Sequence, residues 1–431
     1  MNTKKIMRPV CIIFFCAVLV SCTIKKNTTV FSEPTVYHNI DSLISQKDFF
    51  KSREFFNRDS ATLTEYHALM VKASLHNAFN KPAQSNAAIN KLFEFYGAQL
   101  TDSVKLNLLR IRSGNHARLF DYSGAATALS VLLHDYPLLI SGAEITDFQN
   151  SLETWQALAA RPAQTVTRNG TVRMKMQRDK VGLKNIHIKR DTLSMPFVLD
   201  TGANFSTVNE TTAAKMGMVI VDSAIDVGAI TGKLVEARLG ICPEFSIGSI
   251  VVKNAVFLVF PDASLYFPQV DYQLNGIIGF PVIEALGEIQ LTHEDELIVP
   301  ENPTVYKNQN MTLDFLTPII QLGTEYYTFD TGAANTMLYP KYYNAHPEAY
   351  SGLKLREFQS GSVGGIVKRS GYLVTFNTMI NNKKVTVDNV DLYAEDTNPQ
   401  SAVFYGNLGQ DLFSNFKKIT INFRQMFIKF D

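Results

Sequence analysis

The sequence predicts an α+β multidomain protein with an all-α front half and an all-β back half. Apolar residues recur at helical spacing from about residue 41 to residue 158. From Thr171 onward apolar and polar positions alternate, which is typical of strands that bury one face. Within that second half one tetrapeptide occurs twice, as Asp200-Thr201-Gly202-Ala203 and Asp330-Thr331-Gly332-Ala333. The repeat indicates that one lobe was built twice.

Length and charge limit the possible functions. A chain of 431 residues is too long for one ordinary domain and suggests two or three. The formal net charge is +1, so there is no electrostatic case for a nucleic-acid partner or a polybasic membrane surface. After the N-terminus no apolar run of about 20 residues occurs, so we expect no transmembrane helix in the mature chain.

The N-terminus has the pattern of a targeting segment. Basic residues Lys4, Lys5 and Arg8 precede an apolar run from Val10 to Val20. The run ends in Leu19-Val20-Ser21-Cys22, which resembles a bacterial lipobox. That resemblance implies a signal peptide over residues 1–22, cleavage before Cys22, lipid on the Cys22 thiol, and anchoring of the protein to a membrane of the bacterial cell envelope. The alternative is an ordinary signal peptide with an incidental cysteine.

The residue after the lipobox and the remaining cysteines add two expectations. Thr23 follows Cys22, which by resemblance to proteobacterial sorting signals favours the outer membrane, with the protein facing the periplasm or the cell exterior. Cys11 and Cys16 lie in the segment expected to be removed. Only Cys242 is then left, so we expect no internal disulfide, and Cys242 is interpreted as a small core residue.

Residues 23–165 are interpreted as a helical-hairpin domain. We expect helices over residues 104–119 and 125–136, with turns at Asn80-Lys81-Pro82 and over residues 121–124. Two of the hairpin segments lie about 40 positions apart and resemble tetratricopeptide (TPR-like) repeats. Such a domain either offers a platform to a protein partner or is a spacer that packs on the second half. A break in the pattern over residues 161–170 predicts the linker.

The second half divides into lobe 1 over residues 171–300 and lobe 2 over residues 301–431. Each tetrapeptide follows an apolar run and precedes an apolar-Gly element, Gly276-Ile277-Ile278-Gly279 or Gly406-Asn407-Leu408-Gly409. The separation is 279 − 200 = 79 positions in lobe 1 and 409 − 330 = 79 in lobe 2. The aspartates themselves are offset by 330 − 200 = 130 positions. Two copies in register predict one carboxylate from each lobe at a shared site.

The residue types suit acid–base chemistry on a peptide bond. Two carboxylates at about 3 Å cannot both ionise, so Asp200 and Asp330 would share a proton. The ionised member would activate water while the protonated member polarises the scissile carbonyl. The titration belongs to the pair, so neither role is assigned to one residue. Two further features would support the dyad: Gly202 and Gly332 allow close approach, and Thr201 and Thr331 can each offer a hydroxyl to the opposite loop.

These motifs resemble those of the aspartic peptidases, and the single lobes resemble the retroviral type, the retropepsins. The resemblance covers about residues 171–431. It implies a C-terminal all-β, bilobal domain of the acid protease barrel type, an aspartic endopeptidase activity on extended polypeptides, and no cofactor. It makes Asp200 and Asp330 the catalytic dyad, with Thr201, Gly202, Thr331 and Gly332 as its supports.

The same resemblance implies two substrate-covering flaps. Their candidate residues are Gly228, Ala229, Ile230, Thr231 and Gly232 in lobe 1, and Gly361, Ser362, Val363, Gly364 and Gly365 in lobe 2. Glycines at such tips permit the turn and its opening. Two departures stand out. Many retropepsins follow the apolar-Gly element with Arg-Asp, whereas lobe 1 has Phe280-Pro281 and lobe 2 has Gln410-Asp411. Neither flap contains the tyrosine that is typical of pepsins.

Other interpretations stay open. Each Asp-Thr-Gly could be a simple β-turn. The pair could also line a groove that binds peptide without turnover, which would make the protein a non-catalytic peptide- or protein-binding lipoprotein. His293-Glu294-Asp295-Glu296 suggests metal, but it has no second histidine at i+4 and corresponds to the hairpin turn at residues 423–426. No metal site is therefore expected. Trp155 is interpreted as a core or interdomain residue.

Overall fold

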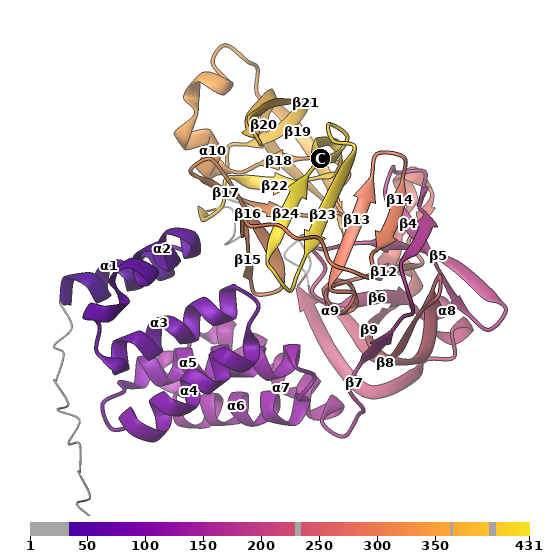
Figure 1. Ribbon diagram of the computed structural model, residues 1–431. Coiled ribbons are helices and arrows are strands. Elements are labelled where there is room, and N and C mark those ends of the chain that lie inside the picture. The colour runs from indigo at the N-terminus through magenta and orange to yellow at the C-terminus, as the bar shows by residue number, and fades with distance from the viewer. Residues whose placement is uncertain (1–33, 229–233, 363–364, 396–401) are drawn as a thin grey trace, which may run out of the picture.

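The computed structural model describes residues 34–228, 234–362, 365–395 and 402–431 (Figure 1). The signal segment 1–22 with Cys22 lies outside the described residues. So do six of the flap candidates: Ala229, Ile230, Thr231, Gly232, Val363 and Gly364. Within the described part, the front of the chain is helical and the rest is mostly β-sheet. The α+β expectation is confirmed at this level.

The helices of the front half gather on one side of the molecule (Figure 1). They are α1 (Pro34–Ser45), α2 (Phe49–Asp59), α3 (Glu65–Ala78), α4 (Pro82–Tyr96), α5 (Asp102–Arg118), α6 (Tyr122–Asp135) and α7 (Gly142–Leu158). Side-chain caps fix several starts: the Ser141 hydroxyl accepts from the Glu144 amide, and the Glu144 carboxylate accepts from the Ser141 amide. Helix α3 packs on α4, and α5 on α6. None of the described helices is long and apolar enough to cross a membrane.

The turns of the two helical hairpins share one conformation. Asn80 precedes α4 with φ 55°, and Phe120 precedes α6 with φ 57°. These two left-handed residues lie 120 − 80 = 40 positions apart, the spacing seen between the sequence segments.

Two helix boundaries differ from expectation. Helix α1 begins at Pro34, before the periodic run, and α6 includes residues 122–124, because the Asp121 carboxylate caps it by accepting from the Gly124 amide.

The first β region, residues 165–299, contains a nine-stranded sheet in the order β1-β9-β6-β12-β5-β4-β8-β7, with β3 paired to β4. Its strands are β1 (Thr165–Thr167), β3 (Gln177–Arg178), β4 (Lys184–Arg190), β5 (Leu193–Leu199), β6 (Ser206–Asn209), β7 (Val219–Gly228), β8 (Leu234–Ile247), β9 (Ile250–Phe260) and β12 (Gly276–Ile278). Two short helices, α8 (Glu210–Lys215) and α9 (Phe280–Ala285), and the ribbon of β10 (Tyr266–Phe267) and β11 (Tyr272–Gln273) complete it.

Strand β1 corrects the expected linker over residues 161–170. Val166 pairs with Val252 at the edge of β9, so part of that segment belongs to the sheet. Pro162 and Gly170 flank β1 in the sequence, and they hid a strand too short to show an alternating pattern.

The second β region, residues 311–430, repeats the arrangement with an eight-stranded sheet in the order β15-β16-β17-β22-β18-β21-β20-β19. Its strands are β15 (Met311–Asp314), β16 (Thr317–Leu322), β17 (Glu325–Phe329), β18 (Met337–Leu338), β19 (Arg356–Ser362), β20 (Gly365–Ile380), β21 (Lys383–Tyr393) and β22 (Gly406–Leu408), with helices α10 (Pro340–Ala345) and α11 (Gln410–Phe413). In both regions a short Gly-initiated strand runs parallel to one neighbour and antiparallel to the other.

A five-stranded sheet joins the two regions (Figure 1), with the order β2-β14-β13-β23-β24. Its strands are β2 (Val172–Lys175), β13 (Glu288–Thr292), β14 (Glu296–Val299), β23 (Lys418–Asn422) and β24 (Phe427–Phe430). At its centre Gln290 of β13 pairs antiparallel with Thr420 of β23. Their separation, 420 − 290 = 130, equals the offset between the two aspartates. The two β regions of the one chain are therefore related by a local twofold axis that passes through this sheet.

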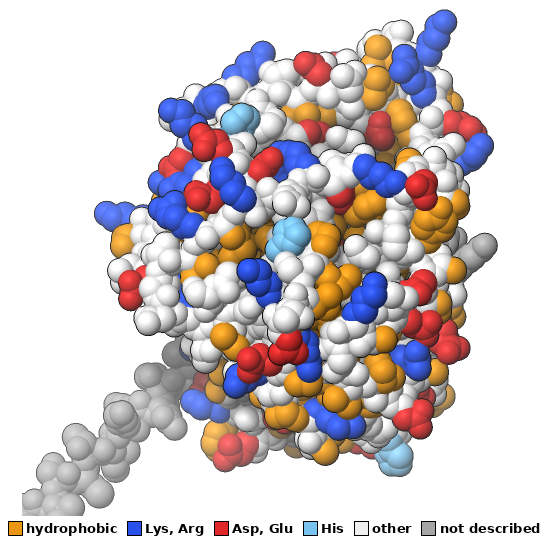
Figure 2. Space-filling view, turned by 90° about the vertical axis from the view of Figure 1, so that its right-hand side faces the viewer, with side chains coloured by type: hydrophobic (Ala, Val, Ile, Leu, Met, Phe, Trp, Pro, Cys, Tyr) orange, Lys and Arg blue, Asp and Glu red, His pale blue; other side chains and the backbone are white. Residues whose placement is uncertain are grey.

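The helices pack on both β regions. Asn80 donates one amide to Glu284 Oε1 at 2.8 Å and to the Phe423 carbonyl at 2.8 Å. Lys47 pairs with Asp314 at 2.6 Å. On the face shown in Figure 2, basic and acidic side chains are interspersed, with hydrophobic groups between them. Of the two interpretations for the helical part, the packing on the second half is present.

Removing the buried side chain of Ile421 should loosen the joint between the two β regions. Ile421 is fully buried and pairs with Ile289 across the central sheet. We expect Ile421→Ala to lower the free energy of unfolding by about 2–5 kcal/mol, measured by urea denaturation. Ile220→Ala, at a position 39% exposed, is the matched control and should cost well under about 1 kcal/mol. Equal losses in the two variants would contradict this packing.

Candidate active site

Each Asp-Thr-Gly-Ala loop begins where a strand ends. Asp200 follows β5 and donates its backbone N–H to the Ile278 carbonyl at 3.0 Å. Asp330 follows β17 and donates to the Leu408 carbonyl at 3.0 Å. The register explains the constant spacing in the sequence. Leu199 pairs with Ile278 and Phe329 with Leu408, at separations of 278 − 199 = 79 and 408 − 329 = 79 positions.

Four hydrogen bonds link the two loops to each other. The Thr201 amide donates to Thr331 Oγ1 at 3.0 Å, and the Thr331 amide donates to Thr201 Oγ1 at 3.1 Å. Each hydroxyl then donates to the opposite strand end, Thr201 to the Phe329 carbonyl at 3.1 Å and Thr331 to the Leu199 carbonyl at 2.7 Å. Both threonines are buried, so water cannot satisfy these polar groups and the cross-loop hydrogen bonds must do so.

The glycines let the loops approach until the carboxyl groups meet. A Cβ atom on Gly202 would lie 2.8 Å from Asp330 Cγ, and one on Gly332 would lie 2.2 Å from Asp200 Cγ. Any larger residue would push the opposite aspartate away. The two carboxyl groups therefore face each other, and the charge of Asp330 acts on Asp200 at short range. The structure thus brings together the two aspartates that the sequence singled out.

The surroundings of Asp200 favour its protonated form. Burial raises the pKa of Asp200 well above its usual value, and the charge of Asp330 and the hydrogen bond with it raise it further. Two backbone donors act in the other direction: the amides of Gly202 and Ala203 donate to Asp200 Oδ1 at 2.8 and 3.0 Å. Both aspartates remain partly exposed to solvent. Two adjacent carboxyl groups that reach solvent, one protonated and one ionised, can take a proton from water and give one to a carbonyl.

Comparison with known protein families gives the same reading of this region. Residues 186–282, from β4 through Asp200 to α9, match the family model described as aspartyl protease. This segment is a retropepsin-like aspartyl protease unit. The resemblance predicted from the motifs is confirmed here, over about a fifth of the 431-residue chain. The second β region lies outside the match but repeats the topology of the aspartyl protease unit. No curated protein matches the chain.

The residues that follow the two apolar-Gly elements, where many retropepsins have Arg-Asp, make different contacts in the two β regions. In the second β region the Asp411 carboxylate accepts from the Thr336 amide at 2.8 Å and from the Thr336 hydroxyl at 2.6 Å. The corresponding position in the aspartyl protease unit, 411 − 130 = 281, is Pro281, which has no carboxylate. The loop after Asp330 is therefore held by its own region, whereas the loop after Asp200 lacks this support.

The helices contact the loop after Asp200 and the start of α9. Phe205, two residues after Ala203, packs against Trp155 of α7 with ring centroids 6.0 Å apart, and Trp155 stacks on Tyr122 at 5.8 Å. Gln164 donates its side-chain amide to the Pro281 carbonyl at 2.9 Å. Trp155 is thus an interdomain residue. Local periodicity could not reveal these contacts, because they join segments far apart in the sequence.

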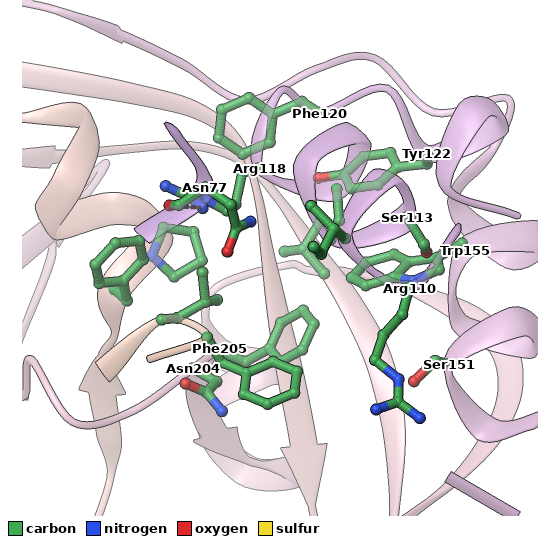
Figure 3. A pocket seen from close by; sticks show the side chains of 18 of the residues that line it. Asn77, Arg110, Ser113, Arg118, Phe120, Tyr122, Ser151, Trp155, Asn204 and Phe205 are labelled. Atoms are coloured by element: carbon green, nitrogen blue, oxygen red, sulfur yellow. Dashed lines mark hydrogen bonds between the residues drawn. The ribbon is translucent and has the colours of Figure 1, made fainter. Parts of the chain in front are cut away.

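A cavity of about 390 Å³ lies behind the same loop (Figure 3). Trp155, Tyr122 and Phe205 contribute aromatic walls, and Arg110 and Arg118 add two guanidinium groups. Burial lowers the pKa of Arg118 from its usual value. The Nε atoms of both arginines have no hydrogen-bond partner, but they are shielded even from a water molecule and so do not face the open space. The cavity separates the helices from the back of the loop that carries Asp200.

Two hairpins carry the flap candidates. In the aspartyl protease unit Gly228 ends β7 and pairs with Leu234 of β8. In the second β region Gly361 pairs with Ile366, and Ser362 pairs with Gly365, across β19 and β20. The tips between these pairs fall outside the described residues.

The side chains that the sequence linked to metal or disulfide chemistry do not form such sites in the described part of the chain. No group of three or more His, Cys, Asp or Glu residues that could hold a metal ion occurs there. Cys242 is a free, buried thiol. Asn407, a residue not predicted to belong to the site, lies in the second apolar-Gly element and donates its side-chain amide to Asp330 Oδ2 at 3.2 Å. The sequence does contain one indication of this role, because Asn407 is polar whereas the equivalent residue in the first copy, Ile277, is apolar.

Replacing Thr331 with valine should weaken the link between the two loops. Thr331→Val leaves the Thr201 amide and the Leu199 carbonyl without their buried partner, at a cost of about 2–4 kcal/mol in urea denaturation. Thr331→Ser keeps the hydroxyl and is the matched control. If the valine variant proves as stable as the serine variant, these bonds do not hold the loops together.

Tryptophan fluorescence should report the contact between the helices and the loop after Asp200. Trp155 is the single tryptophan of the chain, so its emission has one source. Phe205→Ala removes one aromatic neighbour and admits water to the indole, so we expect emission at longer wavelength. Phe95→Ala, at a position 62% exposed on α4, should leave the spectrum unchanged. A Phe205→Ala spectrum identical to that of the unsubstituted protein would contradict the contact.

Proposed function

We propose that this protein is an aspartic endopeptidase in which Asp200 and Asp330 form the catalytic dyad. The single observation that carries the proposal is the approach of the two loops, in which a Cβ atom on Gly202 would lie 2.8 Å from Asp330 Cγ and one on Gly332 would lie 2.2 Å from Asp200 Cγ. Thr201, Gly202, Thr331 and Gly332 would support the dyad, through the cross-loop bonds and the close approach already described. The match of residues 186–282 to the aspartyl protease family supports the same class of activity.

The reaction needs only water and the dyad. Water attacks the scissile carbonyl carbon and gives one proton to the ionised carboxylate. The protonated carboxyl gives its proton to the carbonyl oxygen, whose π electron pair forms the new O–H bond. The tetrahedral diol then collapses: one hydroxyl returns its proton to the carboxylate that had lost it, and the C–N bond breaks. The departing nitrogen keeps the electron pair and takes the proton that came from water, so the dyad returns to its starting state.

The proposed substrate is an extended polypeptide between two lobes of an acid protease barrel. The β7–β8 and β19–β20 hairpins would serve as flaps and bind the peptide backbone through their edges. In this proposal lobe 1 spans residues 171–300 and lobe 2 residues 301–431. The helical-hairpin, TPR-like domain over residues 23–165 would pack behind the dyad loop and offer a platform to a protein partner. No cofactor takes part in the scheme.

The proposed location is the bacterial cell envelope, with the chain held by lipid on Cys22. The sequence Leu19-Val20-Ser21-Cys22 after a short apolar run supports this proposal, and Thr23 favours the outer membrane. Cys22→Ala should release the protein from the membrane fraction of the cells that make it. Retention of the alanine variant in that fraction would count against lipid anchoring.

Loss of either aspartate should abolish peptide cleavage without unfolding the protein. We expect Asp200→Asn and Asp330→Asn each to lower kcat/KM on denatured casein by at least about 10²–10⁴-fold, because the dyad then lacks either its base or its acid. Asp388→Asn, at an exposed strand position in β21, is the control and should retain activity. Absence of cleavage by the unsubstituted protein at any pH, with peptide still bound equally by all variants, would favour the non-catalytic binding protein instead.

A further inference from the structure

The two aspartates occupy equivalent positions in the duplicated sequence, but the residues behind them differ in type. Asn407 in β22 contacts Asp330, and Thr328 in β17 contacts Asn407 in turn. Subtracting the offset of 130 gives Val198 and Ile277 in the first region, both apolar. A polar pair therefore stands behind one carboxylate and an apolar pair behind the other. The difference is built into the sequence and does not depend on a bound ligand.

The polar pair has a defined orientation. Asn407 Nδ2 donates to Asp330 Oδ2 at 3.2 Å, and Thr328 Oγ1 donates to Asn407 Oδ1 at 2.5 Å. A flipped amide would place its carbonyl oxygen against Asp330, where it could not donate to an ionised carboxylate. Thr328 is 2% and Asn407 7% exposed, so water does not compete for these groups. The amide donor is held toward Asp330.

The four carboxylate oxygens of the dyad differ in what they accept. Asp200 Oδ1 accepts from the amides of Gly202 and Ala203. Asp330 Oδ1 accepts from the Gly332 amide at 2.7 Å, and Asp330 Oδ2 accepts from Asn407. Within the part of the chain that the structure describes, Asp200 Oδ2 is the one oxygen to which no protein N–H donates. A proton is placed at least cost on the oxygen that is not already accepting a hydrogen bond.

We propose that the Thr328–Asn407 pair assigns the dyad's single proton, by holding the negative charge on Asp330 and leaving the proton on Asp200 Oδ2. Asn407 and Thr328 are positioning residues in this scheme. Resting on the proposed endopeptidase function, the inference gives each aspartate a role. Asp330 takes the proton from the attacking water, and Asp200 gives its proton to the scissile carbonyl oxygen. In the collapse of the diol Asp200 regains its proton, and Asp330 passes the water proton to the leaving nitrogen.

The other titratable groups around this network support the assignment. Tyr339, which precedes α10, hydrogen-bonds to Thr328, and burial raises the pKa of Tyr339 to about 12, so its phenol stays neutral near pH 7. Tyr393 in β21 raises the pKa of Tyr339 further, whereas the charge of Arg369 in β20 lowers it. On the side of Asp200, the one ionisable group acting on it is Asp330. The raised pKa of Asp200 agrees with a proton that resides there.

The pH dependence of kcat/KM tests the assignment. Removing the donor with Asn407→Leu favours the protonated form of Asp330, so the acidic limb of the profile should move to higher pH by about one unit or more. Thr328→Val removes the hydroxyl that orients the amide and should move the limb in the same direction by a smaller amount. Thr328→Ser keeps the hydroxyl and should give the original profile. Ile277→Leu, the matched substitution in the first region, should leave the limb in place.

A second measurement does not need turnover. The protein is labelled with ¹³C at the aspartate carboxyl carbons, and the two dyad signals are identified by their loss in Asp200→Asn and Asp330→Asn. On lowering the pH, the Asp330 signal should keep its ionised position after the Asp200 signal has become that of a neutral acid. In Asn407→Leu the Asp330 signal should titrate at higher pH. Thermal unfolding of each variant shows whether it is folded at the pH used.

The outcomes separate this inference from the proposed function. If Asp200 ionises before Asp330, or if Asn407→Leu shifts neither the limb nor the Asp330 signal, the assignment is wrong even though the dyad cleaves peptides. If the carboxyl signals titrate as expected while no peptide is cleaved at any pH, the proton assignment holds and the endopeptidase proposal fails.

Discussion

The reciprocal hydrogen bonding of Thr201 and Thr331 is the constraint on which the rest of the site depends. Each threonine accepts from the amide of the other and donates to the strand that leads to the other. The two loops can satisfy these buried groups only together, because neither region supplies the partners alone. This requirement fixes the distance at which Gly202 and Gly332 bring the carboxyl groups into contact. The central sheet, in which Gln290 pairs with Thr420, relates the two β regions by the same local twofold symmetry.

Around this symmetric centre the structure is asymmetric in three places. Asp411 braces the loop after Asp330, whereas Pro281 stands at the matching position. Trp155 and Gln164 contact the loop after Asp200 or the element behind it, from outside the sheet. Asn407 faces one carboxylate only. The two β regions thus have different neighbours, and in the proposed function this difference gives the two aspartates separate roles as acid and base.

Much of the site could be predicted from the sequence, because the repeat carries its own geometry. The 79-position spacing follows from a parallel strand pair, Leu199 with Ile278 and Phe329 with Leu408. The helical and strand halves followed from hydrophobic period. Strand β1 was missed because three residues show no period. The Trp155–Phe205 contact was missed because it joins α7 to a loop 50 positions later, which depends on tertiary packing alone. Asn407 was readable only as a departure from the repeat, and its orientation toward Asp330 needed the structure.

The central claim is that Asp200 and Asp330 act on one reacting group. A crystal structure of the protein with a peptide in which a hydroxyethylene unit replaces the scissile bond tests this claim most directly. We expect the single hydroxyl of this unit to lie within hydrogen-bonding distance of both carboxyl groups, with the peptide extended beneath the β7–β8 and β19–β20 hairpins. A peptide bound elsewhere, for example against the helices, with the hydroxyl remote from both aspartates, would contradict it.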